Sequence, residues 1–181
     1  MSQYEILPGL PPYGREALPF SATGMGTHSE GFVIRFLPGT EGSWVGNFQP
    51  GMTDYYDVIP HPDGKRLIVN SGGQAYAIDP ATPKTWTSFG GSINFAQPVA
   101  ELKAILFGNG LWFELLGSES TIWQTRRISW DGMCDLAVQG LQLTGRSWHI
   151  DDTWPDFAVD LVDGTVTYGS YNGPGSPDYA A

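Results

Sequence analysis

Hydrophobic and polar residues alternate in short runs along most of the chain after residue 31. The runs "GFVIRFLPG" and "GSWVGNFQPG" each hold about five extended residues before a Pro-Gly turn, the usual length of a strand. The segments "TVTYGSY" and "LQLTGRSW" alternate with a period of two, which is typical of half-buried antiparallel strands. The best helix candidate, "PVAELKAILF", begins at a proline and ends in a strand pattern. We therefore predict an all-β protein, an antiparallel meander of about a dozen short strands.

One strand-turn-strand unit occurs twice. The segment "KRLIVNSGG" (65–73) resembles "KAILFGNG" (103–110) in its lysine, its apolar triplet and its Gly turn, and each segment is followed by an aromatic strand. The two lysines are 103 − 65 = 38 residues apart. A period near 40 built from short strands is typical of β-propeller blades. A third, looser unit is expected to run from "DLAVQG" through "FAVDLVDGTVTYGSY".

These units define the expected organisation. Residues 1–30 hold four prolines and four glycines without a period, so we expect an irregular N-terminal arm. Residues 31–171 are expected to form a single all-β domain, and residues 172–181 a flexible C-terminal tail. Because 31–171 could hold only three or four blades, a partial or small propeller, an irregular barrel and a twisted sandwich all remain open.

Composition supports many tight turns and places few constraints on function. Gly (24) and Pro (14) are interleaved with aromatic and β-branched residues, and only 15% of the residues are charged. The start "MSQYEILPGL" does not resemble a signal peptide, and the longest apolar run, "AILF", is too short to span a membrane. Cys134 is the single cysteine, so no intramolecular disulfide can form. We expect a cytoplasmic protein that does not bind membranes.

The net charge of −10 is concentrated near the C-terminus. Residues 1–60 carry −4, residues 61–127 carry +1, and residues 128–181 carry −7, because Arg146 alone opposes eight acidic residues there. Nucleic-acid binding needs clustered Lys and Arg, so we expect no direct contact with nucleic acid. The acidic third is interpreted either as a solvated surface or as a face that attracts a basic partner.

Each histidine is followed two residues later by a carboxylate: His28 by Glu30, His61 by Asp63 and His149 by Asp151. Residues i and i+2 of a strand share a face, so such a pair could bind a divalent metal. The motif "HPDG" favours a turn instead, and "GMGT" before His28 favours a surface loop. His149, Asp151 and Asp152 are the strongest metal candidates, although a solvated acidic loop is the preferred interpretation. No cofactor and no metal are expected.

Motifs for nucleophilic catalysis and dinucleotide binding do not occur in the sequence. It has no Gly-x-Ser-x-Gly elbow, and "GMG" lacks the strand and helix of a dinucleotide fingerprint. In "TIWQTRRISWDG", Arg126 and Arg127 are adjacent, and a buried arginine there is expected to pair with Glu114 or Asp131. The sequence leaves open whether the protein is an enzyme and favours the interpretation that it is not.

Three segments carry a family resemblance: "WVGNFQPG" (44–51), "PHPDGKRLIV" (60–69) and "WQTRRISWDG" (123–132). Together they are similar to small uncharacterised bacterial proteins with β-propeller-like strand repeats. The resemblance implies a fold, carries over no catalytic residue and brings no established activity.

We expect a non-catalytic protein-binding domain, an acidic bacterial immunity-type protein that binds and neutralises a basic partner such as a toxin. Charge complementarity would increase the rate and specificity of such binding. The expected partner-binding residues are five aspartates with Trp154 as a possible aromatic anchor: Asp131, Asp135, Asp151, Asp152 and Asp156. The alternative is a metal-assisted hydrolase or carbohydrate-binding protein that uses His149, Asp151 and Asp152 or an exposed tryptophan.

Overall fold

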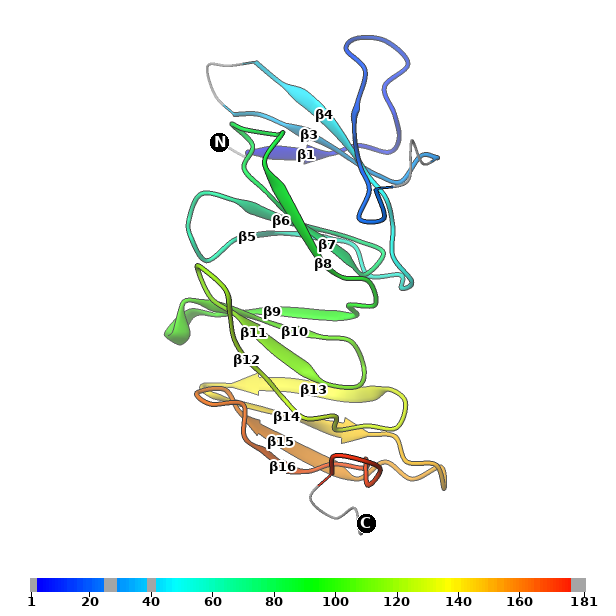
Figure 1. The fold of residues 1–181 in the computed structure, drawn as a ribbon, viewed down its shortest axis with the longest axis vertical. Helices are drawn as coiled ribbons and strands as arrows, with labels where there is room; N and C mark the ends of the chain where they lie inside the picture. The colour runs from blue at the N-terminus through cyan, green and yellow to red at the C-terminus, as the bar shows by residue number, and fades with distance from the viewer. Residues whose placement is uncertain (1–2, 25–28, 39–41, 177–181) are drawn as a thin grey trace. The chain divides into compact units, whose positions relative to one another are not determined.

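The structure is a computed structural model that describes residues 3–24, 29–38 and 42–176. The described chain is all-β, as predicted, and its strands form four open sheets of four strands each (Figure 1). It divides into two compact units, residues 1–93 and 94–181, in place of the single domain expected over 31–171. No described helix is long and apolar enough to cross a membrane.

The first unit holds sheets A and B. Sheet A has the order β1-β3-β4-β2, and sheet B is a meander in chain order. The strands of sheet A are β1 (Tyr4–Ile6), β2 (Leu18–Phe20), β3 (Phe32–Phe36) and β4 (Trp44–Phe48). The strands of sheet B are β5 (Asp57–Pro60), β6 (Leu67–Ser71), β7 (Gln74–Ile78) and β8 (Trp86–Gly90).

The expected N-terminal arm is part of sheet A. Its strand β1 pairs antiparallel with β3, and its strand β2 pairs parallel with β4. These are the two outer strands of the sheet. The prediction of an irregular arm was therefore wrong for these segments, because they pair with residues 28 (34 − 6) to 32 (36 − 4) positions away and leave no local periodicity.

The second unit holds sheets C and D, and both are meanders in chain order. Sheet C contains β9 (Phe95–Val99), a 3₁₀ turn η2 (Ala100–Leu102), β10 (Ala104–Gly108), β11 (Phe113–Leu116) and β12 (Thr121–Gln124). Sheet D contains β13 (Met133–Gln139), β14 (Gln142–Ser147), β15 (Asp156–Asp160) and β16 (Val166–Tyr168). Of the expected tail at 172–181, residues 177–181 lie outside the described part.

The predicted repeat appears as three successive meanders. Sheets B, C and D begin at Asp57, Phe95 and Met133, so both spacings are 38 residues (95 − 57 and 133 − 95). The two similar segments of the sequence supply the second strand of their sheets, β6 and β10. The predicted Gly-Gly turn after β6 is also confirmed, with φ of 54° at Gly72 and 85° at Gly73, as a two-residue hairpin turn requires.

Each unit has a core between its own two sheets. In the first unit, aromatic residues of sheet A pack against aliphatic residues and Tyr76 of sheet B; the cluster is Phe20, Ile34, Phe36, Phe48, Val58, Leu67, Val69, Tyr76 and Ile78. In the second unit, the cluster is Val99, Ala104, Leu106, Phe113, Leu115, Ile128, Leu143, Phe157, Val159 and Leu161. Burial of these faces provides the main driving force for folding.

Candidate functional site at the acidic end of sheet D

The five aspartates expected to bind a partner gather at one end of sheet D. In the strand register, Arg146 of β14 lies opposite Cys134 of β13 and opposite Asp156 of β15. Because neighbouring strands are antiparallel, the start of β13, the end of β14 and the start of β15 meet there. The acidic end is defined as Asp131, Asp135, Asp151, Asp152 and Asp156, and all five are exposed.

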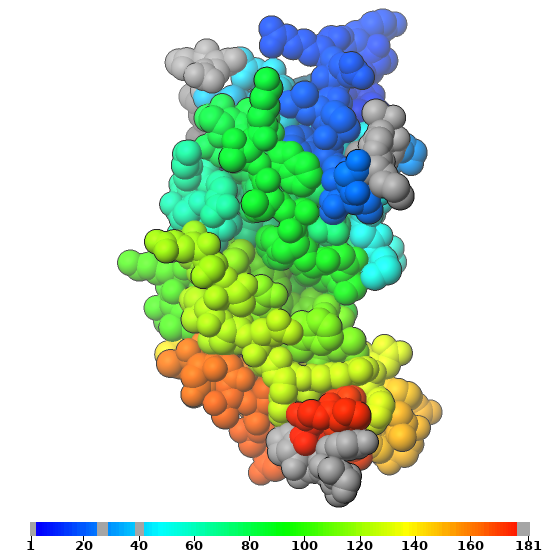
Figure 2. All heavy atoms as spheres, viewed as in Figure 1, coloured from blue at the N-terminus to red at the C-terminus, as the bar shows by residue number. Residues whose placement is uncertain are grey.

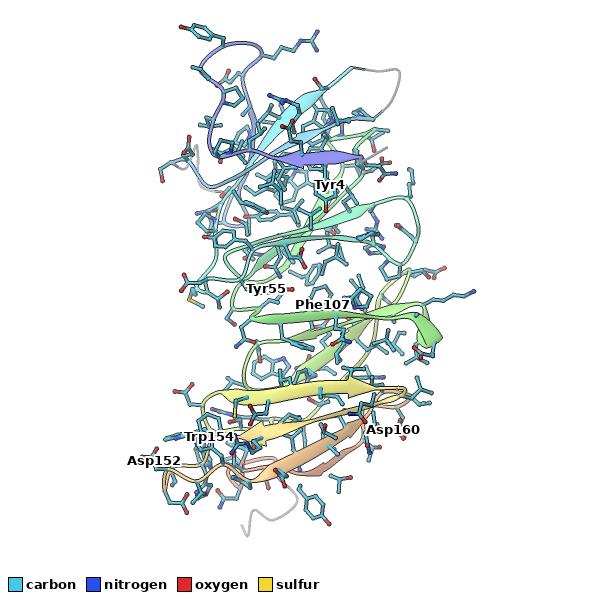
Figure 3. All side chains as sticks on the ribbon, turned by 180° about the vertical axis from the view of Figure 1, so that it is seen from behind. Tyr4, Tyr55, Phe107, Asp152, Trp154 and Asp160 are labelled. Carbon is cyan, nitrogen blue, oxygen red and sulfur yellow. The ribbon has the colours of Figure 1, made fainter. Side chains whose placement is uncertain are left out.

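The loop at 148–155, between β14 and β15, carries two of these aspartates and Trp154. Figure 3 shows Asp152 and Trp154 at one end of sheet D and Asp160 toward the opposite end. The loop lies at the surface of the second unit (Figure 2). Trp154 is 38% exposed, so its indole can be reached by a partner.

Arg146 is the one basic residue on the strands of this end. Its Nε donates a hydrogen bond to Asp135 Oδ2 at 2.7 Å, and its second contact is with the same oxygen. The hydrogen bonds and the charge of Asp135 raise the pKa of Arg146, and the charge of Asp156 acts in the same direction. The five aspartates and Arg146 together carry a net charge of −5 + 1 = −4, so the surface at this end of the sheet is negative.

Hydrogen bonds within the loop hold its carboxylates. Asp151 Oδ1 accepts from the Oγ1 of Thr153 at 2.6 Å and from its backbone N–H at 3.1 Å, and it contacts His149 Nδ1 at 2.7 Å. The contacts with Thr153, and then that with His149, lower the pKa of Asp151 to about 2. Asp152 Oδ1 accepts from Trp148 Nε1 at 3.0 Å. Asp151 is therefore ionised at neutral pH. Hydrogen bonds fix the orientation of the Asp151 and Asp152 carboxylates.

The metal candidates do not converge. His149 contacts Asp151, whereas the carboxylate of Asp152 accepts from the indole of Trp148. Among the residues that the structure describes, no group of three His, Cys, Asp or Glu side chains is placed to hold a metal ion. His28, from the first predicted pair, lies outside the described residues.

Tyr168 is a residue of this end that sequence reasoning missed. It lies opposite Phe157 in the register and two residues after the half-buried Val166, so strand alternation places it on the core side. Its φ of 66° turns the side chain outward instead, and the residue is 76% exposed. A left-handed conformation is uncommon for a bulky residue. The sequence gives only a weak indication that Tyr168 points outward, because Gly169 is the only residue there that indicates the end of the strand.

Backbone strain gathers at the same end of the sheet. Of the four non-glycine residues with positive φ in the described chain, three lie here: Asp135, Asp152 and Tyr168. Asp135 belongs to a β-bulge, where the register between β13 and β14 shifts. Bulges and strained residues occur preferentially at binding sites, where they redirect side chains.

The two adjacent arginines pair differently from the prediction. Arg126 donates to the carbonyl oxygens of Arg127 and Tyr168, at 3.0 and 2.7 Å. Arg127 donates to the carbonyl oxygens of Ser129 and Trp130, at 2.9 and 2.6 Å. The expected pairing with a carboxylate was therefore wrong. Both guanidinium groups donate to backbone carbonyl oxygens, which also need hydrogen-bond donors.

These arginines shape the surface beside the acidic end. The guanidinium of Arg127 lies over the ring of Tyr171, 4.7 Å from its centroid, in a cation–π contact. Arg126 lines an open groove together with Pro155, Asp156 and Tyr168. Both arginines are half-buried, whereas the aspartates are exposed, so the carboxylates are the first charges that an approaching molecule meets.

His61 and Asp63 form a turn, as the "HPDG" motif predicted. Asp63 Oδ1 accepts from the backbone N–H groups of Lys65 and Arg66, both at 2.9 Å, and the Asp63 N–H donates to His61 Nδ1 at 3.1 Å. Burial lowers the pKa of His61, and the nearby Arg66 charge lowers it further. Burial alone would raise the pKa of Asp63, but the hydrogen bonds from Arg66 and Lys65 outweigh it and hold that pKa far below its usual value. The pair is thus explained by turn structure.

No protein-family model matches the sequence, and no curated protein is significantly similar to it. The resemblance to small bacterial proteins with propeller-like repeats stays a prediction.

Proposed function

We propose that this protein is a non-catalytic, immunity-type binding domain that recognises and neutralises a basic protein partner through the acidic end of sheet D. The observation that carries the proposal is the convergence of five exposed aspartates from two strands, β13 and β15, and from the two loops that precede these strands. Exposed carboxylates attract a basic surface over about a Debye length, ~8 Å at physiological salt, and so accelerate association.

Aromatic side chains beside the carboxylates support a protein partner. Trp154 and Tyr168 are 38% and 76% exposed and flank the same end of the sheet. Tyrosine and tryptophan are enriched among the residues that dominate binding energy in protein interfaces. The hydrogen bond between Thr153 and Asp151 holds the loop that carries Trp154, so this loop loses little backbone entropy on binding.

Charge reversal tests the proposal. Asp131→Lys with Asp156→Lys changes two carboxylates for which no hydrogen bond is formed within the described residues. The matched control is Glu101→Lys with Glu119→Lys, which changes the net charge equally. Both acids are exposed, Glu101 in η2 and Glu119 in the turn between β11 and β12. Binding to basic proteins encoded beside this chain would be measured by surface plasmon resonance at several salt concentrations.

We expect the double variant at the acidic end to lower the association rate by about tenfold or more at low salt, whereas the control changes it by less than about threefold. Truncating Trp154 or Tyr168 to Ala should instead mainly raise the dissociation rate. Equal effects of the test and control pairs would show that only net charge matters and would refute the assignment of this surface. Failure of every neighbouring basic protein to bind would refute the function itself.

A further inference from the structure

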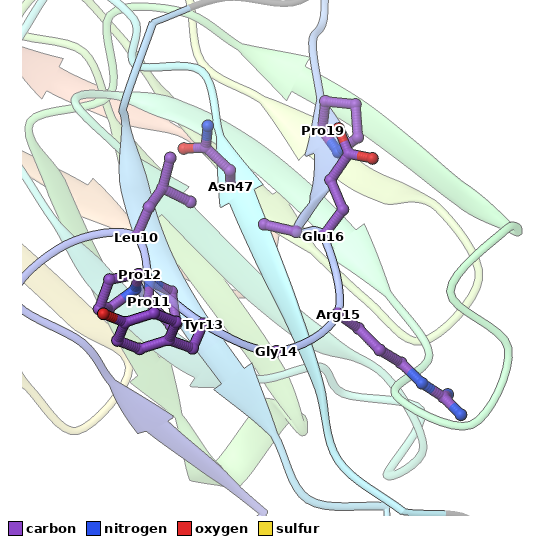
Figure 4. A pocket seen from close by; sticks show the side chains of 10 residues that line it. Leu10, Pro11, Pro12, Tyr13, Gly14, Arg15, Glu16, Pro19 and Asn47 are labelled. Atoms are coloured by element: carbon purple, nitrogen blue, oxygen red, sulfur yellow. The ribbon is translucent and has the colours of Figure 1, made fainter.

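The pockets of the first unit differ in the polar atoms that line them. The pocket shown in Figure 4 lies between the loop at 7–17 and Asn47 of β4. Within the described ranges, no enclosed side-chain atom of its lining lacks a hydrogen bond. A pocket of about 300 Å³ beside the end of β7 differs in this respect, because it is lined by Asp79, whose Oδ2 is enclosed and accepts no hydrogen bond.

Segments from both sheets of the first unit form the walls of the Asp79 pocket. The lining includes Leu37 and Pro38 after β3, Lys65 before β6, and Asp79, Pro80 and Ala81 after β7. The indole Nε1 of Trp44 donates to the carbonyl oxygen of Pro80 at 2.8 Å and so holds the turn at 79–82 against sheet A. The walls are more apolar than polar, because leucine, alanine and two prolines contribute to them.

Asp79 brings a buried negative charge to this pocket. Its side chain is only 8% exposed. Oδ1 accepts from the backbone N–H of Ala81 at 2.9 Å, whereas Oδ2 lies 2.7 Å from Nζ of Lys65 without the alignment of a hydrogen bond. The contact with Lys65 lowers the pKa of Asp79 and, together with the Ala81 N–H, outweighs burial, which raises it. The carboxylate is therefore ionised at neutral pH.

Lys65 is a weakly held counter-ion for this carboxylate. Its side chain is 71% exposed, so water solvates the ammonium and the alkyl stem covers little of the pocket wall. Ion pairs with such an exposed partner contribute little, because holding a long side chain in one geometry costs entropy. Leu37, in the same wall, is 42% exposed. An ammonium that enters with its own alkyl chain can align with Oδ2 and cover apolar surface that Lys65 leaves open.

The repeat shows that the strand frame does not require this carboxylate. Asp79 directly follows β7, and Gly117 directly follows β11 in the equivalent place, 38 residues later (117 − 79). Lys65 recurs as Lys103, so sheet C keeps the lysine and turns without the carboxylate. Because burying a charge is costly, a buried carboxylate that the frame does not need is a candidate binding group.

The available acceptor restricts the class of ligand. Oδ1 is occupied by the Ala81 N–H, so the fork of a guanidinium group finds a single acceptor, whereas an ammonium group needs only one. A metal ion needs several protein ligands, and the described residues hold no group of three His, Cys, Asp or Glu that could supply them. The volume is at the lower end of ligand pockets, which span ~300–1,000 Å³, and suits a short alkyl chain.

We propose that this pocket binds a primary alkylammonium group, which displaces Lys65 from Asp79 Oδ2 and packs its alkyl chain against Leu37 and Pro80. A small amine and the lysine side chain of another polypeptide share this chemistry. The site lies in the first unit and does not depend on the function proposed for the acidic end.

The test uses the full chain labelled with ¹⁵N and chloride salts at equal ionic strength: n-butylammonium, Nα-acetyl-lysine methylamide, tetramethylammonium and sodium. The backbone amide signal of Ala81 reports on the carboxylate, because this N–H donates to Asp79 Oδ1. We expect a saturable shift in the millimolar range with n-butylammonium, and binding weaker by about tenfold or more with tetramethylammonium, which has no N–H. Tighter binding of the lysine derivative than of n-butylammonium assigns the ligand to a polypeptide, and any other order assigns it to a small amine.

Asp79→Asn keeps the oxygen that accepts from Ala81 but removes the charge, and it should weaken binding of n-butylammonium by about tenfold or more. The control is Asp160→Asn, the same change at an aspartate whose Oδ1 likewise accepts a backbone hydrogen bond, from Val162 at 2.8 Å. It should bind as the unaltered chain does.

A second pair of variants tests the displacement of Lys65 and decides the question if Asp79→Asn fails to fold. Lys65→Met removes the competing ammonium but keeps an alkyl stem, so it should bind n-butylammonium about threefold or more tighter. Lys84→Met makes the same change in net charge at another exposed lysine of the first unit and should leave binding unchanged.

An Ala81 signal that moves equally with n-butylammonium and tetramethylammonium would overturn the proposal, because only ionic screening would then be at work. Equal binding by the Asp79→Asn and Asp160→Asn variants would do the same. A Lys65→Met protein that binds no tighter than Lys84→Met would show that Lys65 is not displaced and would also overturn it.

Discussion

Gly145 on β14 provides the sharpest stability test of the second unit. Burial along β14 alternates strictly, so Leu143, Gly145 and Ser147 face the core. A Cβ at Gly145 would lie 2.7 Å from Leu136 Cδ2 and 2.9 Å from Cζ of Phe157, its partner in the register. Phe157 is 2% exposed, so its ring cannot move aside without disturbing the core. The φ of Gly145 is not in the left-handed region, so Gly145→Ala tests packing without backbone strain.

The expected decrease in the free energy of unfolding of Gly145→Ala follows from two opposing effects. Adding a methyl group to a filled core costs about 1–3 kcal/mol. Replacing Gly by Ala restricts the unfolded chain and returns about 0.4–1 kcal/mol. Gly145→Ala should therefore lower the free energy of unfolding by roughly 1–2 kcal/mol, read in urea titrations as a lower midpoint with an unchanged slope.

Two further variants separate packing from other causes. Phe157→Leu removes the ring that the new methyl group would meet, so the double variant should lose about 1 kcal/mol less than the sum of the single variants. Gly117→Ala is the control. Its Cβ would lie 3.1 Å from Ile122, whose side chain is 55% exposed and free to shift, and 3.4 Å from the carbonyl oxygen of Ser120, an ordinary contact. A Gly145→Ala protein as stable as the unaltered chain, or strict additivity with Phe157→Leu, would refute the reasoning.

Two other predictions concern the first unit. Because the pKa of Asp63 is far below that of an unfolded aspartate, its stabilising effect is fully present above pH ~4 and is lost as the pH falls through the folded value. Asp63→Asn should cost about 1–2 kcal/mol at neutral pH, and its difference from the unaltered chain should shrink in acid denaturation followed below pH ~4. Tyr76 donates to the carbonyl of Gln49 at 2.8 Å, so Tyr76→Phe should cost roughly 1 kcal/mol in urea titrations. Burial raises the pKa of Tyr76, so its ultraviolet titration should lie above that of exposed tyrosines, and coincident titrations would contradict its buried position.

Local patterns account for what could be predicted. Alternation marked β14 and β16 of sheet D, apolar triplets marked β6 and β10, and the Gly72–Gly73 pair marked a hairpin. These signals were visible because side-chain period and left-handed turns are properties of neighbouring residues. The 38-residue repeat was visible because β6 and β10 need the same sequence of lysine, apolar triplet and turn. The role of Asp63 in its turn followed for the same reason.

Pairing over long distances accounts for what could not be predicted. The segment at 1–30 gives no strand period, yet the register with β3 and β4 makes two strands of it and carries the loop over Asn47. Composition indicated an acidic C-terminal third, but only the antiparallel register of β13, β14 and β15 brings its aspartates to one end of a sheet. Tyr168 faces outward because its backbone turns left-handed at the end of β16, and alternation alone predicts the opposite. The sequence by itself determined strands, turns and charge, whereas the tertiary structure decided which side chains meet, because register and chain reversal depend on partners that no local pattern specifies.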